Sequence, residues 1–127
     1  MSKIDAACRE VIDKTEWIAI STAGPAGPHV VATWGDYVRA LGVQDDTILI
    51  PVGMMHKTEA NLQRDNRIEL LCGSRQVQGT RGPGKGCSLV GTAQLQTAGP
   101  QFDAVKAKFP WARAALVATV EEARTQL

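Results

Sequence analysis

Short apolar stretches separated by glycine, proline or acidic turns recur along most of the chain, and few helical patterns lie between them. Runs of roughly four to eight residues with many β-branched side chains are typical of strands. A parallel sheet needs a crossover helix between most neighbouring strands, so these hairpin-like connections indicate antiparallel pairing. The chain is therefore expected to be mostly β, an antiparallel barrel of six to seven strands with short flanking helices. The predicted strands cover residues 17–22, 29–34, 37–43, 47–52, 67–74, 87–96 and 114–122.

The flanking helices are brief. Residues 3–14 place Ile4, Cys8 and Val11 on one helical face, and Ser2 is expected to cap this helix. Two further helices are expected, one starting near residue 56 and one over residues 102–109, which Pro110 ends. With a length of 127 residues, the sequence predicts one domain over residues 1–127.

Residues 79–86 (GTRGPGKG) are the one segment of biased composition. They resemble a phosphate-binding P-loop, but Lys85 is followed by glycine, and a strand follows where a P-loop needs a helix. A flexible connection between two strands is the expected structure.

Charge and cysteine usage exclude several classes of protein. Fourteen basic and thirteen acidic residues leave a net charge of +1 without any block of like charge, which disfavours a nucleic-acid or membrane-surface protein. No stretch is long and apolar enough to span a membrane, and the charged N-terminus does not resemble a signal peptide. The three cysteines, Cys8, Cys72 and Cys87, lack metal or redox-motif spacing, so three free thiols in a cytoplasmic protein are expected.

The stretch 50–61 (IPVGMMHKTEAN) has the strongest chemical signal. A strand ends near Val52, and a helical pattern begins near His56, so Lys57 and Thr58 fall in the first helical turn. Unpaired amides, the positive end of the helix dipole, an ammonium and a hydroxyl together favour a bound phosphate. A solvated helix start with the same residues is the alternative. His56 is a candidate proton shuttle, or simply a residue at the helix start.

Three aromatic residues follow strand ends or precede a strand. Trp34 and Tyr37 lie in ATWGDY (residues 32–37), and Trp111 follows Pro110 in FPWAR (residues 109–113). Each of them is compatible with ordinary core or interface packing. Taken singly, ordinary packing is the more frequent role of such residues, and a flat, apolar pocket for a planar ligand is the alternative.

Taken together, these segments resemble a known family. The order ATWGDY, PVGMMHKTEAN, GSRQV, GPGKG and KFPWARAALV, ending in TQL, is similar to the small FMN-binding proteins of sulfate-reducing bacteria. Those proteins belong to the wider pyridoxamine-phosphate-oxidase-like family, which is built on a split β-barrel. The resemblance extends from about residue 17 to the C-terminus.

The resemblance implies a cofactor, FMN, and a set of residues that bind it. Lys57 and Thr58 match the phosphate-binding pair, supported by Thr33, and the backbone of Gly53 and Met54 lies against the polar edge of the ring. The aromatic positions are Trp34 and Tyr37, and Trp111 and Leu127 reach the flavin from the other subunit of a homodimer. Two departures concern this site: Ala32 stands where relatives can have asparagine, and Met54 where they can have glycine.

The function that follows is an electron carrier with non-covalently bound FMN, which exchanges electrons with a redox partner such as a multihaem cytochrome. An FMN-dependent oxidase or reductase of a small molecule is the alternative, and Arg81 and Lys85 are its only candidate substrate-binding cations. A flavin store without a redox partner is a third reading. No catalytic residue is assigned, because no Ser–His–acid set or close carboxylate pair is evident.

Overall fold

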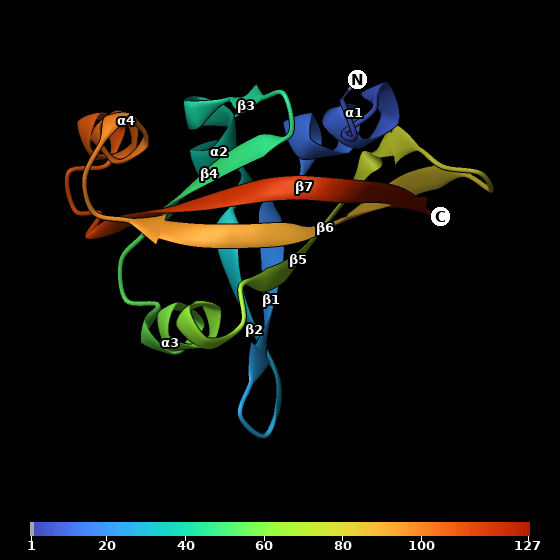
Figure 1. Cartoon of the computed structure of the whole chain (residues 1–127). Helices are drawn as coiled ribbons and strands as arrows, with labels where there is room; N and C mark the ends of the chain where they lie inside the picture. Colours follow the sequence, from blue (N-terminus) through green and yellow to red (C-terminus); the bar gives the residue numbers. More distant parts are fainter. Residues whose placement is uncertain (1) are drawn as a thin grey trace.

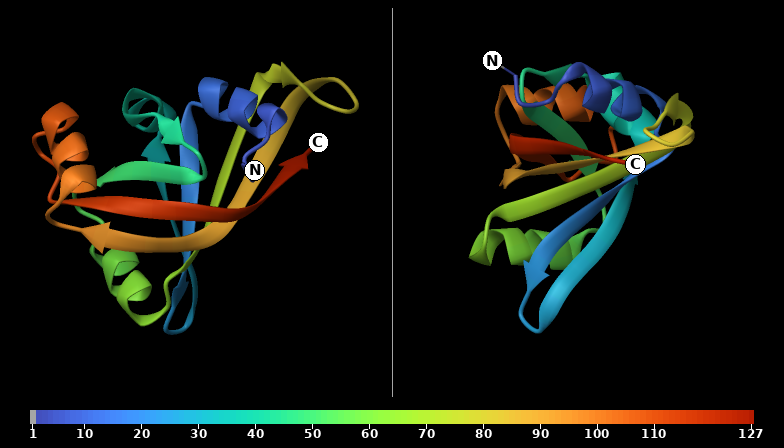
Figure 2. Two further views of the ribbon diagram at one scale, coloured as in Figure 1. Left: turned by 45° about the horizontal axis from the view of Figure 1, so that its top comes forward. Right: turned by 90° about the vertical axis from the view of Figure 1, so that its right-hand side faces the viewer.

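A seven-stranded antiparallel sheet forms the body of the protein, with the strand order β2-β1-β5-β6-β7-β4-β3. The structure is a computed structural model that describes residues 2–127. Figures 1 and 2 show the long, coiled strands β5, β6 and β7 crossing the shorter ones. The predicted mostly-β split barrel with short flanking helices is confirmed. The strands are β1 (Trp17–Gly24), β2 (Gly27–Trp34), β3 (Val43–Gln44), β4 (Thr47–Val52), β5 (Arg67–Gln78), β6 (Pro83–Gln96) and β7 (Ala114–Gln126).

Four helices cover the sheet: α1 (Ala6–Lys14), α2 (Gly35–Leu41), α3 (His56–Arg64) and α4 (Pro100–Lys108). In Figure 1, α1, α2 and α4 lie on one side of β6 and β7, and α3 lies on the other side. Over residues 2–127, none of the helices has both the length and the apolar character needed to cross a membrane.

The core follows from the alternation of side chains along the strands. On β1, Ile18 and Ile20 are fully buried, and on β4 Ile48 and Ile50 are buried in the same way. Each such side chain contributes roughly 1.5–3 kcal/mol of transfer free energy. Within β6 and β7 a register shift occurs at Val90 and Gly91. A bulge of this kind bends and twists paired strands, which helps the sheet to coil into a barrel.

Two predictions about the first 45 residues are wrong. Ser2 does not cap α1, because its hydroxyl donates to the Asp46 carboxylate at 2.8 Å. The cap is Asp5, whose carboxylate accepts from the amide of Cys8 at 2.9 Å. The second error concerns residues 37–43, which were expected to form a strand but lie largely in α2.

The end of α2 explains its helical conformation. Gly42 has a φ of 80°, a value that glycine adopts without steric cost, and its amide donates to the carbonyl of Val38. Val38 is fully buried against the core. Burial of this face therefore outweighs the β propensity of tyrosine and valine over the same residues.

The connection at residues 79–86 is more ordered than predicted. Strand β6 begins at Pro83, so only four residues separate it from β5, and the amide of Gly79 donates to the carbonyl of Gly82 at 2.8 Å. The last strand is also longer than expected, since β7 continues to Gln126. The amide of Thr80 donates to the carbonyl of Leu127 at 2.8 Å, which connects the hairpin to the chain end.

The prediction of three free thiols is also wrong. Cys8 of α1 and Cys87 of β6 form a disulfide, with their Cα atoms 5.6 Å apart. The two residues are 79 positions apart in sequence, and they meet because the buried face of α1 packs on the sheet. Cys72, on β5, stands opposite Cys87 of β6 in the strand register. It is a free, buried thiol, and burial raises its pKa to about 12.

Candidate functional site

The start of α3 has backbone donors that no side chain caps. β4 ends at Val52, and after three intervening residues the helix begins at His56. Met55 is the residue that precedes the helix, and its side chain makes no capping hydrogen bond. The amide of Glu59 donates to the carbonyl of Met55 at 3.0 Å, so the helical bonding begins there. The amides before Glu59 and the positive end of the helix dipole are suited to an anion.

Thr58 lies in this first turn and has an unusual environment. Its side chain is only 1% exposed, yet among residues 2–127 its hydroxyl oxygen has no hydrogen-bond partner. A buried polar group without a partner destabilises a protein by roughly 1–3 kcal/mol. Lys57, the preceding residue, is exposed at the same helix start. An unpartnered hydroxyl next to an ammonium and uncapped amides is the arrangement expected for the binding of a phosphate group.

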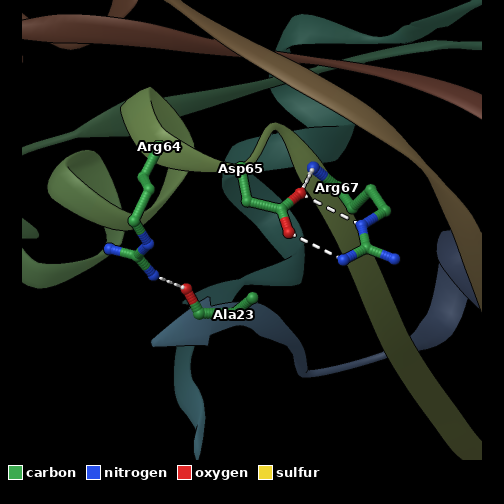
Figure 3. Close-up of polar contacts among 4 residues, drawn as sticks. All are labelled: Ala23, Arg64, Asp65 and Arg67. Carbon is green, nitrogen blue, oxygen red and sulfur yellow. Dashed lines mark hydrogen bonds and ion pairs between the residues drawn. The ribbon is translucent and has the colours of Figure 1, made fainter. Parts of the chain in front are cut away.

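Contacts farther along α3 hold the helix against the barrel. The side-chain amide of Asn61 donates to the hydroxyl of Thr22 on β1 at 3.0 Å, and both residues are buried. At the end of the helix, Arg64 donates to the carbonyl of Ala23 near the tip of the β1–β2 hairpin, as Figure 3 shows. These contacts fix the orientation of α3, and therefore the direction in which its N-terminus points.

The turn that leads from α3 into β5 contains a charged pair (Figure 3). Asp65 accepts two hydrogen bonds from the guanidinium of Arg67, at 3.0 and 2.7 Å, and a third from the Arg67 amide at 3.1 Å. The side-chain bonds from Arg67 are the main reason that the pKa of Asp65 falls to about 2.

An aromatic cluster lies beside the turn between β4 and α3 and contacts it through Trp111. The rings of Tyr37, Phe109 and Trp111 form a cluster with centroid distances of 4.8 to 5.8 Å. A Cβ atom added to Gly53 would lie 3.3 Å from the Trp111 ring, so the ring rests directly on the glycine. Tyr37, Trp111 and Gly53 of one chain therefore lie together, and Trp111 remains about half exposed at this place.

Arg113 joins the same turn to α3. Its Nε donates to the carbonyl of Gly53 at 2.7 Å, and its Nη2 lies 2.6 Å from a carboxylate oxygen of Glu59. His56 lies 3.8 Å from that oxygen. Met54, between these groups, is highly exposed.

Trp34 and Thr33 lie at the end of β2, in a second group. They line a cavity of about 220 Å³ together with Ala32, Glu16 and Trp17. Trp17 stands opposite Trp34 in the β1–β2 register, and both indole rings are about half exposed. The hydroxyl-bearing Thr33 is buried.

Leu127 lies at the other end of the molecule from Trp111. The two residues flank β7, whose thirteen residues span roughly 40 Å at about 3.3 Å per residue. Leu127 is 81% exposed and lines a cavity of about 410 Å³ with Trp17, Leu71 and Lys85. A single chain therefore does not bring Leu127 to the Gly53 turn.

Two aromatic residues of these groups were not predicted as site residues. Trp17 is the first residue of a strand and was taken only as part of it, and Phe109 was taken only as the end of a helix. The scarcity of aromatic residues, 5% of the chain, is the signal that could have drawn attention to both.

An antiparallel split barrel with an uncapped, hydroxyl-bearing helix start beside an aromatic cluster defines a class of small proteins suited to a planar ligand that carries a phosphate. The family model described as pyridoxamine 5'-phosphate oxidase matches residues 4–127. The chain belongs to this family, as its sequence resemblance indicated.

Related proteins agree with this assignment. The chain is 48% identical over 118 residues to a protein named FMN-binding protein from Nitratidesulfovibrio vulgaris (strain Miyazaki F), covering 93% of this chain and 94% of the relative. Among solved structures, a variant of Group A Streptococcus HupZ has a TM-score of 0.77 at 20% identity, covering 97% and 99% of the two chains. An FMN-binding protein from Syntrophomonas wolfei has a TM-score of 0.65 at 16% identity, covering 94% and 88%. These two structures show a shared fold.

Proposed function

We propose that the chain, as one unit over residues 1–127, binds one FMN without a covalent bond. The observation that carries the proposal is the buried, unpartnered hydroxyl of Thr58 at the uncapped start of α3. The name of the relative from Nitratidesulfovibrio vulgaris supports FMN as the ligand. A phosphate bound by this hydroxyl, by the Lys57 ammonium and by first-turn amides would satisfy every group that is left open there.

Different residues around the helix start bind different parts of FMN. The phosphate is bound by Thr33, Lys57 and Thr58. The backbone at Gly53 and Met54 faces the polar edge of the ring. Bound FMN supplies one- and two-electron redox chemistry, and the protein adjusts it through burial and hydrogen bonds. Apolar contact with the ring comes from Trp34, Tyr37 and Trp111, which keep water away from it. Ala32 adds no polar contact.

A titration of the cofactor-free protein with FMN and riboflavin tests this proposal. FMN should bind more tightly than riboflavin, because riboflavin lacks the phosphate. The Lys57→Ala variant should weaken FMN binding roughly tenfold to hundredfold, and riboflavin binding little. Lys14→Ala is the control, because Lys14 is an exposed lysine at the end of α1. Equal losses for both ligands would show that Lys57 is structural, and a protein that takes up no FMN would refute the proposal.

We further propose that the protein is an electron carrier, with a cytochrome such as a multihaem cytochrome as its redox partner. His56, the candidate proton shuttle, is exposed and lies 3.8 Å from a carboxylate oxygen of Glu59. The alternative, an oxidase or reductase of a small molecule, would need a second binding site near the ring. Photoreduced protein mixed with an oxidised multihaem cytochrome should transfer electrons within one turnover. Steady turnover of a small substrate without any such transfer would favour the enzyme. The cytoplasmic location stays a prediction.

We propose a homodimer in which the partner subunit completes each site with its chain end. Trp111 lies beside Gly53 of its own chain, and Leu127 lies at the far end of β7, so a second copy is needed to bring both residues to one ring. The position of Trp111 favours contact with the flavin of its own subunit, whereas the family resemblance implies contact with the flavin of the other subunit. Twofold symmetry lets each subunit give and receive the same contact.

Deletion of Leu127 tests the shared site. The truncated protein should lose FMN affinity, while its Lys57-dependent preference for FMN over riboflavin persists. Sedimentation should show a dimer for the full-length protein at micromolar concentration. A monomer that binds FMN fully would refute the shared site, and unchanged FMN affinity after the deletion would refute the role of Leu127.

A further inference from the structure

The segment from Trp111 to Arg113 holds the turn after β4 through several contacts. The backbone amide of Arg113 donates to the carbonyl of Val52 at 2.8 Å, and its Nε donates to the carbonyl of Gly53 at 2.7 Å. Its Nη2 donates to Glu59 in the first turn of α3 at 2.6 Å. One guanidinium therefore connects the turn to the helix that carries the anion site.

The contact with Gly53 determines the direction of a neighbouring donor. The peptide bonds of residues 2–127 are all trans, so the N–H of Met54 points away from the carbonyl of Gly53 in the same plane. Trp111 restrains the same peptide at the Gly53 Cα, where an added Cβ would lie 3.3 Å from the ring. When Arg113 holds the Gly53 oxygen, the direction of the Met54 N–H is set.

We propose that Arg113 is a positioning residue of the flavin site, an inference that rests on the proposed binding of FMN. Arg113 aims the Met54 N–H at the polar edge of the ring and fixes the spacing between this donor and the anion site of α3. Reduction adds electron density to the ring, so a well-aimed N–H stabilises reduced flavin more than oxidised flavin. Arg113 acts on the ring through the Gly53 peptide, since its Nε and Nη2 donate to Gly53 and Glu59.

The shape of the side chain, rather than its charge, is what this role requires. A guanidinium presents its donors in a rigid planar fork, whereas a lysine ammonium is a single point on a flexible stem. Arg113 is 43% exposed and Glu59 20% exposed, so the pair is partly screened by solvent.

The experiment compares Arg113→Lys and Arg113→Ala with the wild type. Both variants should lower the midpoint potential of bound FMN and weaken FMN binding roughly threefold to tenfold. Arg124→Lys is the matched control, because Arg124, on β7, makes a similar exposed pair with Glu122. Glu59→Gln, which keeps an oxygen acceptor for Arg113, should retain most of the wild-type potential.

The Met54 amide resonance of the cofactor-free proteins gives a second measurement that needs no flavin. It should move in both Arg113 variants and stay in place in Arg124→Lys. A wild-type potential in Arg113→Lys, with a shifted potential in Arg113→Ala, would overturn the proposal in favour of a charge effect. An unmoved Met54 resonance in both Arg113 variants would overturn it as well. If the wild type takes up no FMN, the proposed function fails, and the resonance still shows whether Arg113 positions this peptide.

Discussion

Replacement of Thr58 by valine should have opposite effects on the stability of the free protein and on ligand binding. The Thr58 hydroxyl is buried and has no partner among residues 2–127, and valine has nearly the same shape without the hydroxyl. Removal of a buried, unsatisfied hydroxyl relieves a cost of roughly 1–3 kcal/mol. Even at the low end, the melting temperature of a protein of this size should rise by about 4 °C.

The same substitution should harm the binding of FMN. A hydrogen bond to a charged acceptor contributes roughly 1.5–3 kcal/mol, so its loss should raise the FMN dissociation constant about tenfold to 150-fold. Urea unfolding of the cofactor-free protein measures the first effect, and flavin fluorescence titration measures the second.

Thr22→Val is the matched control for this prediction. The hydroxyl of Thr22 is buried like that of Thr58, but it accepts a hydrogen bond from Asn61 at 3.0 Å. Its removal leaves the Asn61 amide without this partner, so Thr22→Val should destabilise the free protein by roughly 1–3 kcal/mol. If Thr58→Val destabilises the protein in the same way, or leaves FMN affinity unchanged, the reasoning about Thr58 is refuted.

Two further predictions concern stability. Arg67 holds the pKa of Asp65 at about 2, below its ordinary value of 3.8. The contribution of Asp65 to stability is therefore complete only above about pH 5, and it is lost as the pH falls through 2. The difference in unfolding free energy between wild type and Asp65→Asn, measured by urea unfolding, should therefore shrink as the pH falls over this range. A difference that stays constant with pH would contradict this prediction. The Cys8–Cys87 disulfide closes a loop with a separation of 79 residues. For a loop of this length, the chain-entropy model gives a stabilisation of the folded protein of about 4.5 kcal/mol. Cys8→Ser should lower the urea midpoint under non-reducing conditions, and equal midpoints would show that the bond does not form.

Much of the fold could be predicted from local sequence signals. Buried isoleucines that alternate along β1 and β4, with glycine and proline between strands, were sufficient to place most strands of the barrel; the strand expected over residues 37–43 is the exception. The start of α3 was also predictable, because the change from an apolar strand to the HKTEAN pattern occurs within a few residues. Lys57 and Thr58 were placed correctly in the first helical turn for this reason.

Other features depended on which elements meet in space. The residues from Tyr37 to Leu41 are compatible with a strand or a helix, and burial of Val38 together with the positive φ of Gly42 decides for the helix. The missing hydrogen bond of Thr58 could not be seen in the sequence either, because burial and lack of a partner are properties of the packed structure.

By itself, the sequence determined the elements whose signals lie among neighbouring residues: the strand alternation, the turns and the start of α3. Only the tertiary structure brought Arg113 to Gly53, 60 residues away, and joined Cys8 to Cys87, 79 residues away. The physical reason is that local conformation follows from steric and hydrogen-bonding preferences within a few residues. Contacts across such separations exist only after the sheet has coiled and its helices have packed, so they depend on the register and twist of every strand between them.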